Sequence, residues 1–213
     1  MKEKVKKMGR TDTSTSTRIK SPVKYYINFS GETGVFTYWD NVEKKNVALE
    51  DLDMIVMDTR GSVSGWSDEH NSKIFSNYFR TTKEKISVRA GDKDLLTGTY
   101  LADKTKIKEL GGKYQVNIFA LVDINGDWVP AVLQLTGSSL AAWSTFTETN
   151  KIWDIYKSLL VVRRGNQQKK GRVLFYTPEF SLEAVTDKMS SMADTVYKDY
   201  VKPYLEQYAS TEA

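Results

Sequence analysis

The sequence predicts a β-rich α+β fold in which a curved sheet forms a barrel and carries a few helices. Three observations lead to this fold class. Residues 113–146 alternate apolar and polar side chains around an Asn-Gly pair, and short β-forming runs divided by glycine recur from Val23 onward. The C-terminal stretch 182–208 instead repeats apolar side chains at three- and four-residue steps, which indicates an amphipathic helix.

Composition restricts the class of protein further. With 213 residues, 40% hydrophobic and 12% aromatic, the chain is long enough for one well-filled domain. The absence of cysteine excludes disulfides, thiolate metal sites and a cysteine nucleophile. No run approaches the roughly 18 apolar residues of a membrane helix, and the N-terminus lacks the apolar segment of a secretory signal. We therefore expect a cytoplasmic protein, in the host cytoplasm if the chain is viral.

Charge is distributed unevenly along the chain. Residues 1–24 hold eight Lys or Arg and two Asp or Glu, so the remainder carries a small net negative charge although the whole chain is +4. Residues 1–21 combine Lys, Ser and Thr without periodicity, which predicts a disordered basic arm. This arm is either a solubilising tail or a contact to phosphates. Attraction to nucleic acid must therefore depend on local clusters of charge.

The central hairpin is the best-specified element. Asn125-Gly126 suits a two-residue type I′ turn, because both positions need a positive φ. In the resulting register Ile124 faces Asp127 and Val116 faces Leu135, which makes one face almost wholly apolar. The other face carries amides together with Phe119 and Trp128, and a shift of one residue would exchange the two faces. After this hairpin, Thr136-Gly137-Ser138-Ser139 supplies N-cap candidates for a helix.

Shorter elements surround the hairpin. Strands are predicted over 25–29, 35–40, 46–49, 53–59, 74–80 and 86–90, and a helix over 99–110. The strand over 53–59 is expected to open into a Gly/Ser loop that holds Trp66. Alternation in 74–80 directs Phe75 and Phe79 inward and Tyr78 and Arg80 outward. In the C-terminal helix, Pro203 is expected to cause a kink or to end the first part.

A second ribbon over 159–182 concentrates positive charge at one end. Its cations are Arg163, Arg164, Lys169, Lys170 and Arg172, and no acidic residue lies between positions 155 and 178. One interpretation is a hairpin tip kept soluble and unpaired by its charges. The other is an arm that binds nucleic acid.

The chain offers few residues for catalysis or for a metal. His70 is the single histidine and lies in a polar segment, with no GxSxG motif to supply a nucleophile. Asp40 with Glu43-Lys44-Lys45 has the form of a metal-dependent nuclease motif, but the triplet falls where a hairpin turn is expected. We predict that the protein is not an enzyme, has no cofactor and holds no metal. A metal-dependent nuclease is the lesser alternative.

The order of several motifs resembles the single-stranded DNA-binding proteins of bacteriophages. These motifs are GVFTYWD, KYQVNIFALV, LQLTGSSLAAWSTF and VLFYTPEFSL, followed by the terminal amphipathic helix. The resemblance covers residues 23 to about 205 and implies an OB-like five-stranded barrel with additional hairpins. It further implies a protein that coats single strands in replication or recombination and binds through strands 2 and 3 and the flanking loops. Many such proteins end in an acidic tail, whereas this chain ends YLEQYASTEA.

These expectations divide the chain into a basic arm (1–21), an OB-like nucleic-acid-binding domain (22–183) and a C-terminal helix (184–213). We expect rings to stack on bases and cations to contact phosphates. The predicted rings are Tyr38, Trp39, Tyr78, Phe119 and Trp128, and the predicted cations are Arg80, Arg89, Arg163, Arg164, Lys169, Lys170 and Arg172. The partner is single-stranded DNA, with RNA, replication or recombination proteins and homo-oligomerisation left open, and no membrane. The alternative function is a structural or protein-interaction module, for example of a virion.

Overall fold

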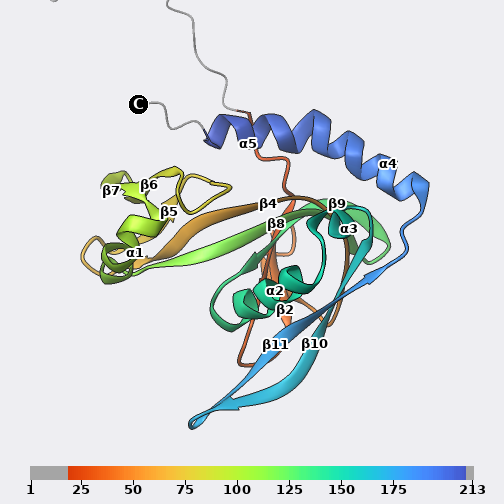
Figure 1. Ribbon diagram of the computed structural model, residues 1–213, viewed down its shortest axis with the longest axis horizontal. Helices are drawn as coiled ribbons and strands as arrows, with labels where there is room; N and C mark the ends of the chain where they lie inside the picture. Colours follow the sequence, from red (N-terminus) through yellow and green to blue (C-terminus); the bar gives the residue numbers. More distant parts are fainter. Residues whose placement is uncertain (1–18, 210–213) are drawn as a thin grey trace, which may run out of the picture.

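In the computed structural model of the chain, residues 19–209 are described, and their strands form one sheet (Figure 1). The strands are β1 (Tyr25–Phe29), β2 (Phe36–Asp40), β3 (Lys45–Leu49), β4 (Leu52–Ser67), β5 (Ser72–Ser76), β6 (Lys85–Ala90), β7 (Lys93–Thr99), β8 (Gly112–Ile124), β9 (Asp127–Leu135), β10 (Leu159–Lys170) and β11 (Val173–Glu183). The helices are α1 (Tyr100–Glu109), α2 (Gly137–Thr149), α3 (Ile152–Tyr156), α4 (Asp187–Val196), the π-helix η1 (Tyr197–Val201) and α5 (Lys202–Ala209).

The sheet is open and mixed, which confirms the β-rich α+β class. Its order is β3-β2-β1-β9-β8-β4-β5-β6-β7; β10 pairs with the same edge of β4 as β5, at the opposite end of that strand, and β11 lies beside β10. The β1–β9 pair is parallel, and the other named pairs are antiparallel. Among the described residues, the pairings do not close a five-stranded barrel.

The central hairpin forms in the predicted register. Asn125 and Gly126 have φ of 58° and 92°, and the ladder runs from Ile124 opposite Asp127 to Val116 opposite Leu135. At the end of β9, the backbone N–H of Thr136 donates to Ser139 Oγ at 3.2 Å, and α2 begins at Gly137. The strand, turn, strand and helix follow one another as the turn chemistry and alternation predict.

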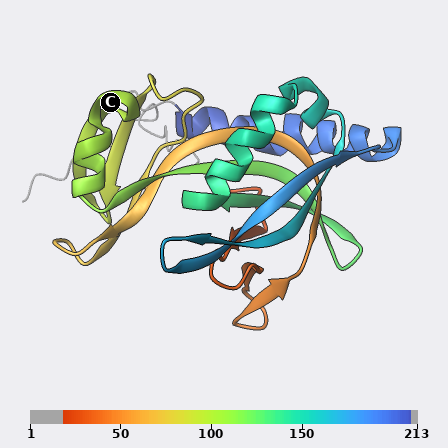
Figure 2. The same ribbon diagram turned by 60° about the horizontal axis from the view of Figure 1, so that its bottom comes forward.

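Strand β4 is longer than the sequence predicts. The segment expected as a Gly/Ser loop continues the strand to Ser67, so this expectation is wrong. The glycines serve close packing: a Cβ on Gly61 would collide with the ring of Phe79, and one on Gly65 would collide with the backbone of Gly111. As a result β4 pairs with β8 along its length, while its other edge pairs with β10 at one end and β5 at the other. Figure 2 shows β4 and β8 curving together between the two parts of the sheet.

Three apolar clusters lie within the described part of the chain. The first lies between the inner face of the sheet and α2 and α3, and includes Phe36, Ile118 and Trp143. The second lies under the C-terminal helix on the outer face and includes Phe119 and Leu205. A third unites β5, β6 and β7 with α1. The outer face of the sheet is therefore only partly covered.

The C-terminal helix is one long rod built from α4, η1 and α5 (Figure 1). Leu182 belongs to β11, and the helix begins after Thr186, whose hydroxyl accepts from the backbone N–H of Met189 at 3.4 Å. Pro203 does not end the helix, since α5 continues to Ala209. The turn just before it, Tyr197–Val201, is a widened π turn, which accommodates a proline that has no N–H to donate back along the helix. The predicted arm lies mostly outside the described residues, but Ile19 N–H donates to Gln207 Oε1 at 2.8 Å.

Candidate functional site

An open groove of about 450 Å³ lies on the uncovered part of the outer face. Its floor comes from β4, β8 and β9, and its two walls come from β1 and β2 on one side and from β5 on the other. The polar face that the hairpin register predicts supplies this floor. We call this cavity the groove.

Amide side chains make the floor of the groove rigid. Asn117 is fully buried, and its Oδ1 accepts from Gln115 Nε2 at 2.7 Å and from Gln134 Nε2 at 3.2 Å. Its Nδ2 donates to Ser62 Oγ at 2.8 Å and to the backbone oxygen of Arg60 at 3.3 Å. Because all the hydrogen bonds of Asn117 lie within the protein, it holds the two glutamines in place and leaves them to face the cavity.

Exposed aromatic rings surround this floor. Trp39 on β2 is 48% exposed, Phe75 on β5 is 41% exposed and Tyr26 on β1 is 39% exposed. All three rings line the groove, and Lys73 on β5 adds a cation. Large exposed rings around a polar floor are typical of a binding surface, because burying them would otherwise stabilise the fold.

The five predicted rings lie in different environments. At least one of Tyr38 and Trp39 was expected to lie outside the core, and Trp39 does so. Tyr38 is buried and packs against Tyr25, with 4.3 Å between the ring centroids. Phe119 is 1% exposed, and Trp128 is half-buried in the cluster under the C-terminal helix. Phe119 therefore cannot stack on a ligand in this structure, and its predicted exposure is wrong. The C-terminal helix covers this half of the predicted polar face.

Tyr78 is part of the same covered region. Its ring packs edge-on against Phe119 at 5.4 Å and against Tyr204 of α5 at 6.4 Å. Burial and the neighbouring tyrosines raise its pKa, so its hydroxyl stays protonated. Tyr78 borders the groove but is held by the helix.

The predicted cations also separate into groups. Arg163 bridges to Asp53 at 2.9 Å and to Asp51 at 3.4 Å, and Arg89 pairs with Asp94 at 2.8 Å. Asp51 and Asp53 lie far from Arg163 in the sequence, and Asp94 lies across the β6–β7 turn from Arg89, so the charge pattern along the chain did not reveal either ion pair. These ion pairs largely neutralise the positive charges of Arg163 and Arg89 toward a ligand.

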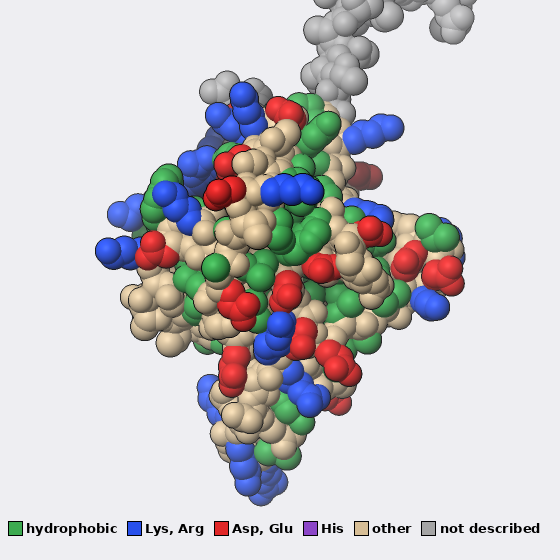
Figure 3. All heavy atoms as spheres, turned by 90° about the vertical axis from the view of Figure 1, so that its right-hand side faces the viewer, with side chains coloured by type: hydrophobic (Ala, Val, Ile, Leu, Met, Phe, Trp, Pro, Cys, Tyr) green, Lys and Arg blue, Asp and Glu red, His purple; other side chains and the backbone are tan. Residues whose placement is uncertain are grey.

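The end of the β10–β11 hairpin keeps its positive charge exposed. Lys169, Lys170 and Arg172 are exposed there, and Figure 3 shows Lys and Arg gathered at the projecting tip. Nearer the body, the Arg164 guanidinium lies over the ring of Tyr176 at 5.3 Å. We call residues 164–176 the finger. Its tip shares no residue with the lining of the groove.

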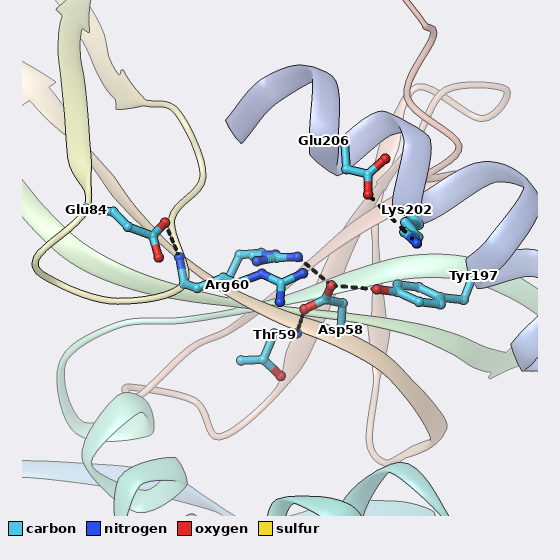
Figure 4. Close-up of polar contacts among 8 residues, drawn as sticks. Asp58, Thr59, Arg60, Glu84, Tyr197, Lys202 and Glu206 are labelled. Carbon is cyan, nitrogen blue, oxygen red and sulfur yellow. Dashed lines mark hydrogen bonds and ion pairs between the residues drawn. The ribbon is translucent and has the colours of Figure 1, made fainter. Parts of the chain in front are cut away.

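Arg80 lies at a second cavity of about 510 Å³, lined also by Asp58, Trp153 and Tyr197. Behind it, Asp58 Oδ2 pairs with Arg60 Nη2 at 2.7 Å and accepts from the Tyr197 hydroxyl at 3.2 Å (Figure 4). Burial and the Asp58 carboxylate raise the pKa of Tyr197. The hydrogen bond from Tyr197 links the C-terminal helix to this ion pair of β4.

Several groove residues were missed by sequence reasoning. Phe75 was expected to point inward, but Ile74 is buried and Phe75 is exposed, so that expectation is wrong. The alternation was extended across residues 77–80, whereas β5 ends at Ser76 and the register against β4 then shifts by one residue. Phe75 lies opposite Ser64 and the buried Phe79 lies opposite Gly61, so the two rings point to opposite faces. The amides of Gln115, Asn117 and Gln134 could have indicated the floor of the groove from the sequence. Three amides on one face of a sheet must hydrogen-bond to one another if they are buried.

The residues of the nuclease motif lie in the expected turn between β2 and β3. Asp40 Oδ1 accepts from the backbone N–H groups of Val42 and Glu43 at 2.7 and 3.1 Å, and these bonds lower its pKa. Lys45 and Glu43 pair at 3.6 Å in the solvent. Within residues 19–209, no group of three or more His, Cys, Asp or Glu is placed to hold a metal ion.

Comparison of the chain with protein families, with curated proteins and with solved structures gives no match. The resemblance to phage single-stranded DNA-binding proteins therefore stays a prediction. In the described part of the chain, none of the helices combines the length and apolar character needed to span a membrane.

Proposed function

We propose that the protein binds single-stranded DNA, with little sequence preference, through the groove. The observation that carries the proposal is the ring of exposed Trp39, Phe75 and Tyr26 around a floor of fixed amides. Base stacking on aromatic rings contributes roughly 1 to 3 kcal/mol per base and is tolerant of sequence, because every base has a flat face. Such a protein would protect single strands in replication or recombination.

The order of elements supports an OB-like interpretation of the sheet. Strands β4, β8 and β9 are followed by α2 and then by β10 and β11, and β4 pairs with both β8 and β10. If these are the five core strands, strands 2 and 3 are β8 and β9, whose outer face forms the groove floor. The connection between strands 1 and 2 then carries Phe75, and that between strands 4 and 5 is the tip of the finger. OB-folds bind oligonucleotides with these parts.

Titration of labelled oligo(dT), with Trp fluorescence recorded alongside and duplex DNA as control, tests the proposal. We expect quenching of Trp emission and preference for the single strand, because Trp39 is one of the rings placed to stack. Oligo(U) in the same assay compares RNA with DNA. Absence of measurable affinity together with unchanged Trp emission would reject the proposal.

The second candidate is a protein-interaction module, which one observation favours. Val173 and Leu174 on the finger are 64% and 54% exposed, as expected of a surface that meets another protein. Salt distinguishes the two functions. Binding to single strands weakens with a slope of about −0.7 in log K against log salt per phosphate neutralised, whereas a protein interface would show no affinity for oligo(dT).

A further inference from the structure

Two further cavities continue from the groove. The first, which we call the bridging cavity, measures about 510 Å³ and shares Asn28 and Gln115 with the groove. The second lies between α1 and the start of α2, measures about 810 Å³, and shares Gly111 and Lys113 with the bridging cavity. We call it the helix cleft. The shared residues make the three cavities neighbours in this order, and we call the series the track.

The bridging cavity continues the chemistry of the groove. Trp66 at the end of β4 is 52% exposed and lines it, together with Thr136 and the exposed Lys113. One carboxylate, that of Asp68, also lies in the lining. An exposed indole beside a cation can stack on a base while the cation meets a phosphate.

The helix cleft combines rings with three lysines. Tyr100, Lys104 and Lys108 follow one another at intervals of four along α1, so they form one stripe of that helix, and this stripe lines the cleft. Lys113 and Tyr114 of β8 complete that side, and the rings of Tyr100 and Tyr114 lie 4.8 Å apart. Among the described residues that line the cleft, none is acidic.

Of the two acidic side chains of α1, Asp103 is engaged elsewhere, and the exposed Glu109 does not line the cleft. Asp103 on α1 accepts from the Thr99 backbone N–H at 3.1 Å and lies 3.9 Å from Lys106. Across the cleft, the first turn of α2 contains no acidic residue, so the partial positive charge of that helix end remains. The cleft is therefore suited to an anionic ligand with apolar parts.

We propose that the helix cleft is the continuation of the nucleic-acid path, and that a single strand in the groove passes Trp66 and has its phosphates held by Lys104, Lys108 and Lys113. This inference rests on the proposed function. Continuity with the groove and the exposed indole between them favour a nucleic acid over an acidic peptide, for which only the cleft itself would be needed.

Oligonucleotide length separates the two proposals. Oligo(dT) of about 4 nucleotides occupies the groove, whereas one of about 12 nucleotides extends along the track. The double variant Lys104→Ala/Lys108→Ala removes two exposed charges from the cleft. The matched control, Lys188→Ala/Lys198→Ala, removes two exposed lysines from the C-terminal helix. Fluorescence anisotropy over a salt series gives affinities and slopes for each.

We expect the cleft variant to weaken binding of the longer oligonucleotide several-fold and to reduce the magnitude of its salt slope by about 1.4, since each lysine contributes about 0.7. The shorter oligonucleotide and the control variant should behave as wild type. Trp66→Ala should likewise weaken the longer oligonucleotide alone.

Wild-type protein that binds neither oligonucleotide contradicts the proposed function itself. If wild type binds both, a cleft variant equal to the control for the longer oligonucleotide would overturn the track alone. An equal loss for both lengths would also overturn it, because that loss would reflect general charge. The same holds if an acidic peptide binds the cleft while the variant leaves the affinity for DNA unchanged.

Discussion

Asn117 shows how a single residue organises the groove. It lies in a largely buried and apolar strand, and its amide oxygen and its amide nitrogen each have two hydrogen-bond partners inside the protein. A buried polar group left without partners costs roughly 1 to 3 kcal/mol, so this arrangement has little freedom to change. The groove is thus preformed at its floor, while its aromatic rim meets the solvent.

Trp39→Ala should weaken binding to oligo(dT) by about 5- to 150-fold, because it removes a ring worth roughly 1 to 3 kcal/mol of stacking. Anisotropy titration at one salt concentration measures the change. Trp153→Ala is the matched control, since Trp153 is 63% exposed but lines the second cavity instead of the groove. Equal losses in the two variants would argue against the groove.

For single residues, the sequence predicts on which face of the sheet a side chain lies better than it predicts whether that side chain is exposed to solvent. Alternation correctly assigns Phe119 to the same face as Asn117, and the register confirms it. Whether that face is open depends on a contact with Tyr78 and the helix residue Tyr204, far along the chain. A local pattern carries no information about such contacts, so Trp39 was found and the burial of Phe119 was not.

Among the elements, the C-terminal helix contacts β4 through a hydrogen bond to a buried ion pair as well as through its apolar cluster. Asp58 sits at an irregularity in the β4–β8 ladder between Val56 and Asp58, and its carboxylate meets both Arg60 and Tyr197. The bulge turns the carboxylate toward the helix. The sequence gives no sign of this link, because Tyr197 looks like one more packing residue in an amphipathic stripe.

Asp58→Ala should lower the free energy of unfolding by about 3 to 5 kcal/mol, because it leaves the Arg60 guanidinium buried without its partner. Urea denaturation measures the loss. Asp94→Ala breaks the exposed pair with Arg89 and should cost less than about 1 kcal/mol. If both variants lose a similar free energy of unfolding, the buried Asp58–Arg60 pair contributes no more to stability than the exposed Arg89–Asp94 pair.

The finger is the element whose charge has the clearest consequence. Replacing Lys169, Lys170 and Arg172 together by alanine should reduce the magnitude of the salt slope for oligo(dT) by about 2, since each cation contributes about 0.7. Because these side chains are exposed, the melting temperature should stay unchanged. An unaltered slope would indicate that the finger does not meet phosphates and would favour the protein-interaction module.

For the whole molecule, alkaline pH should reveal the packing of the C-terminal helix. Burial raises the pKa of Tyr204 from 10.0 to about 12. Above pH 10 the unfolded chain releases this proton while the folded protein keeps it, so stability is full below pH 10 and falls as the pH rises toward 12. Tyr204→Phe should show a smaller fall in urea midpoint over this range. An identical pH profile in the variant would contradict the assignment.

The overall arrangement was predictable only in part. The Asn-Gly turn, the helix start after Thr136 and the C-terminal amphipathic stripe each depend on neighbouring residues, and each forms as expected. The extent of β4 and the parallel pairing of β1 with β9 depend on distant partners. Gly61 and Gly65 resemble loop residues in the sequence, although the structure uses them for close approach.

The long β4–β8 ladder has a mechanical consequence. One wall of the groove is formed by β5, which pairs with β4, and the other by β1 and β2, which reach β8 through β9. Both walls are therefore joined through the β4–β8 strand pair. Because the paired strands β4 and β8 run without interruption between the two walls, the spacing between Phe75 and Trp39 changes only if this strand pair bends or twists. A free and a ligand-loaded molecule should therefore superimpose closely, with adjustment confined to side-chain rotamers.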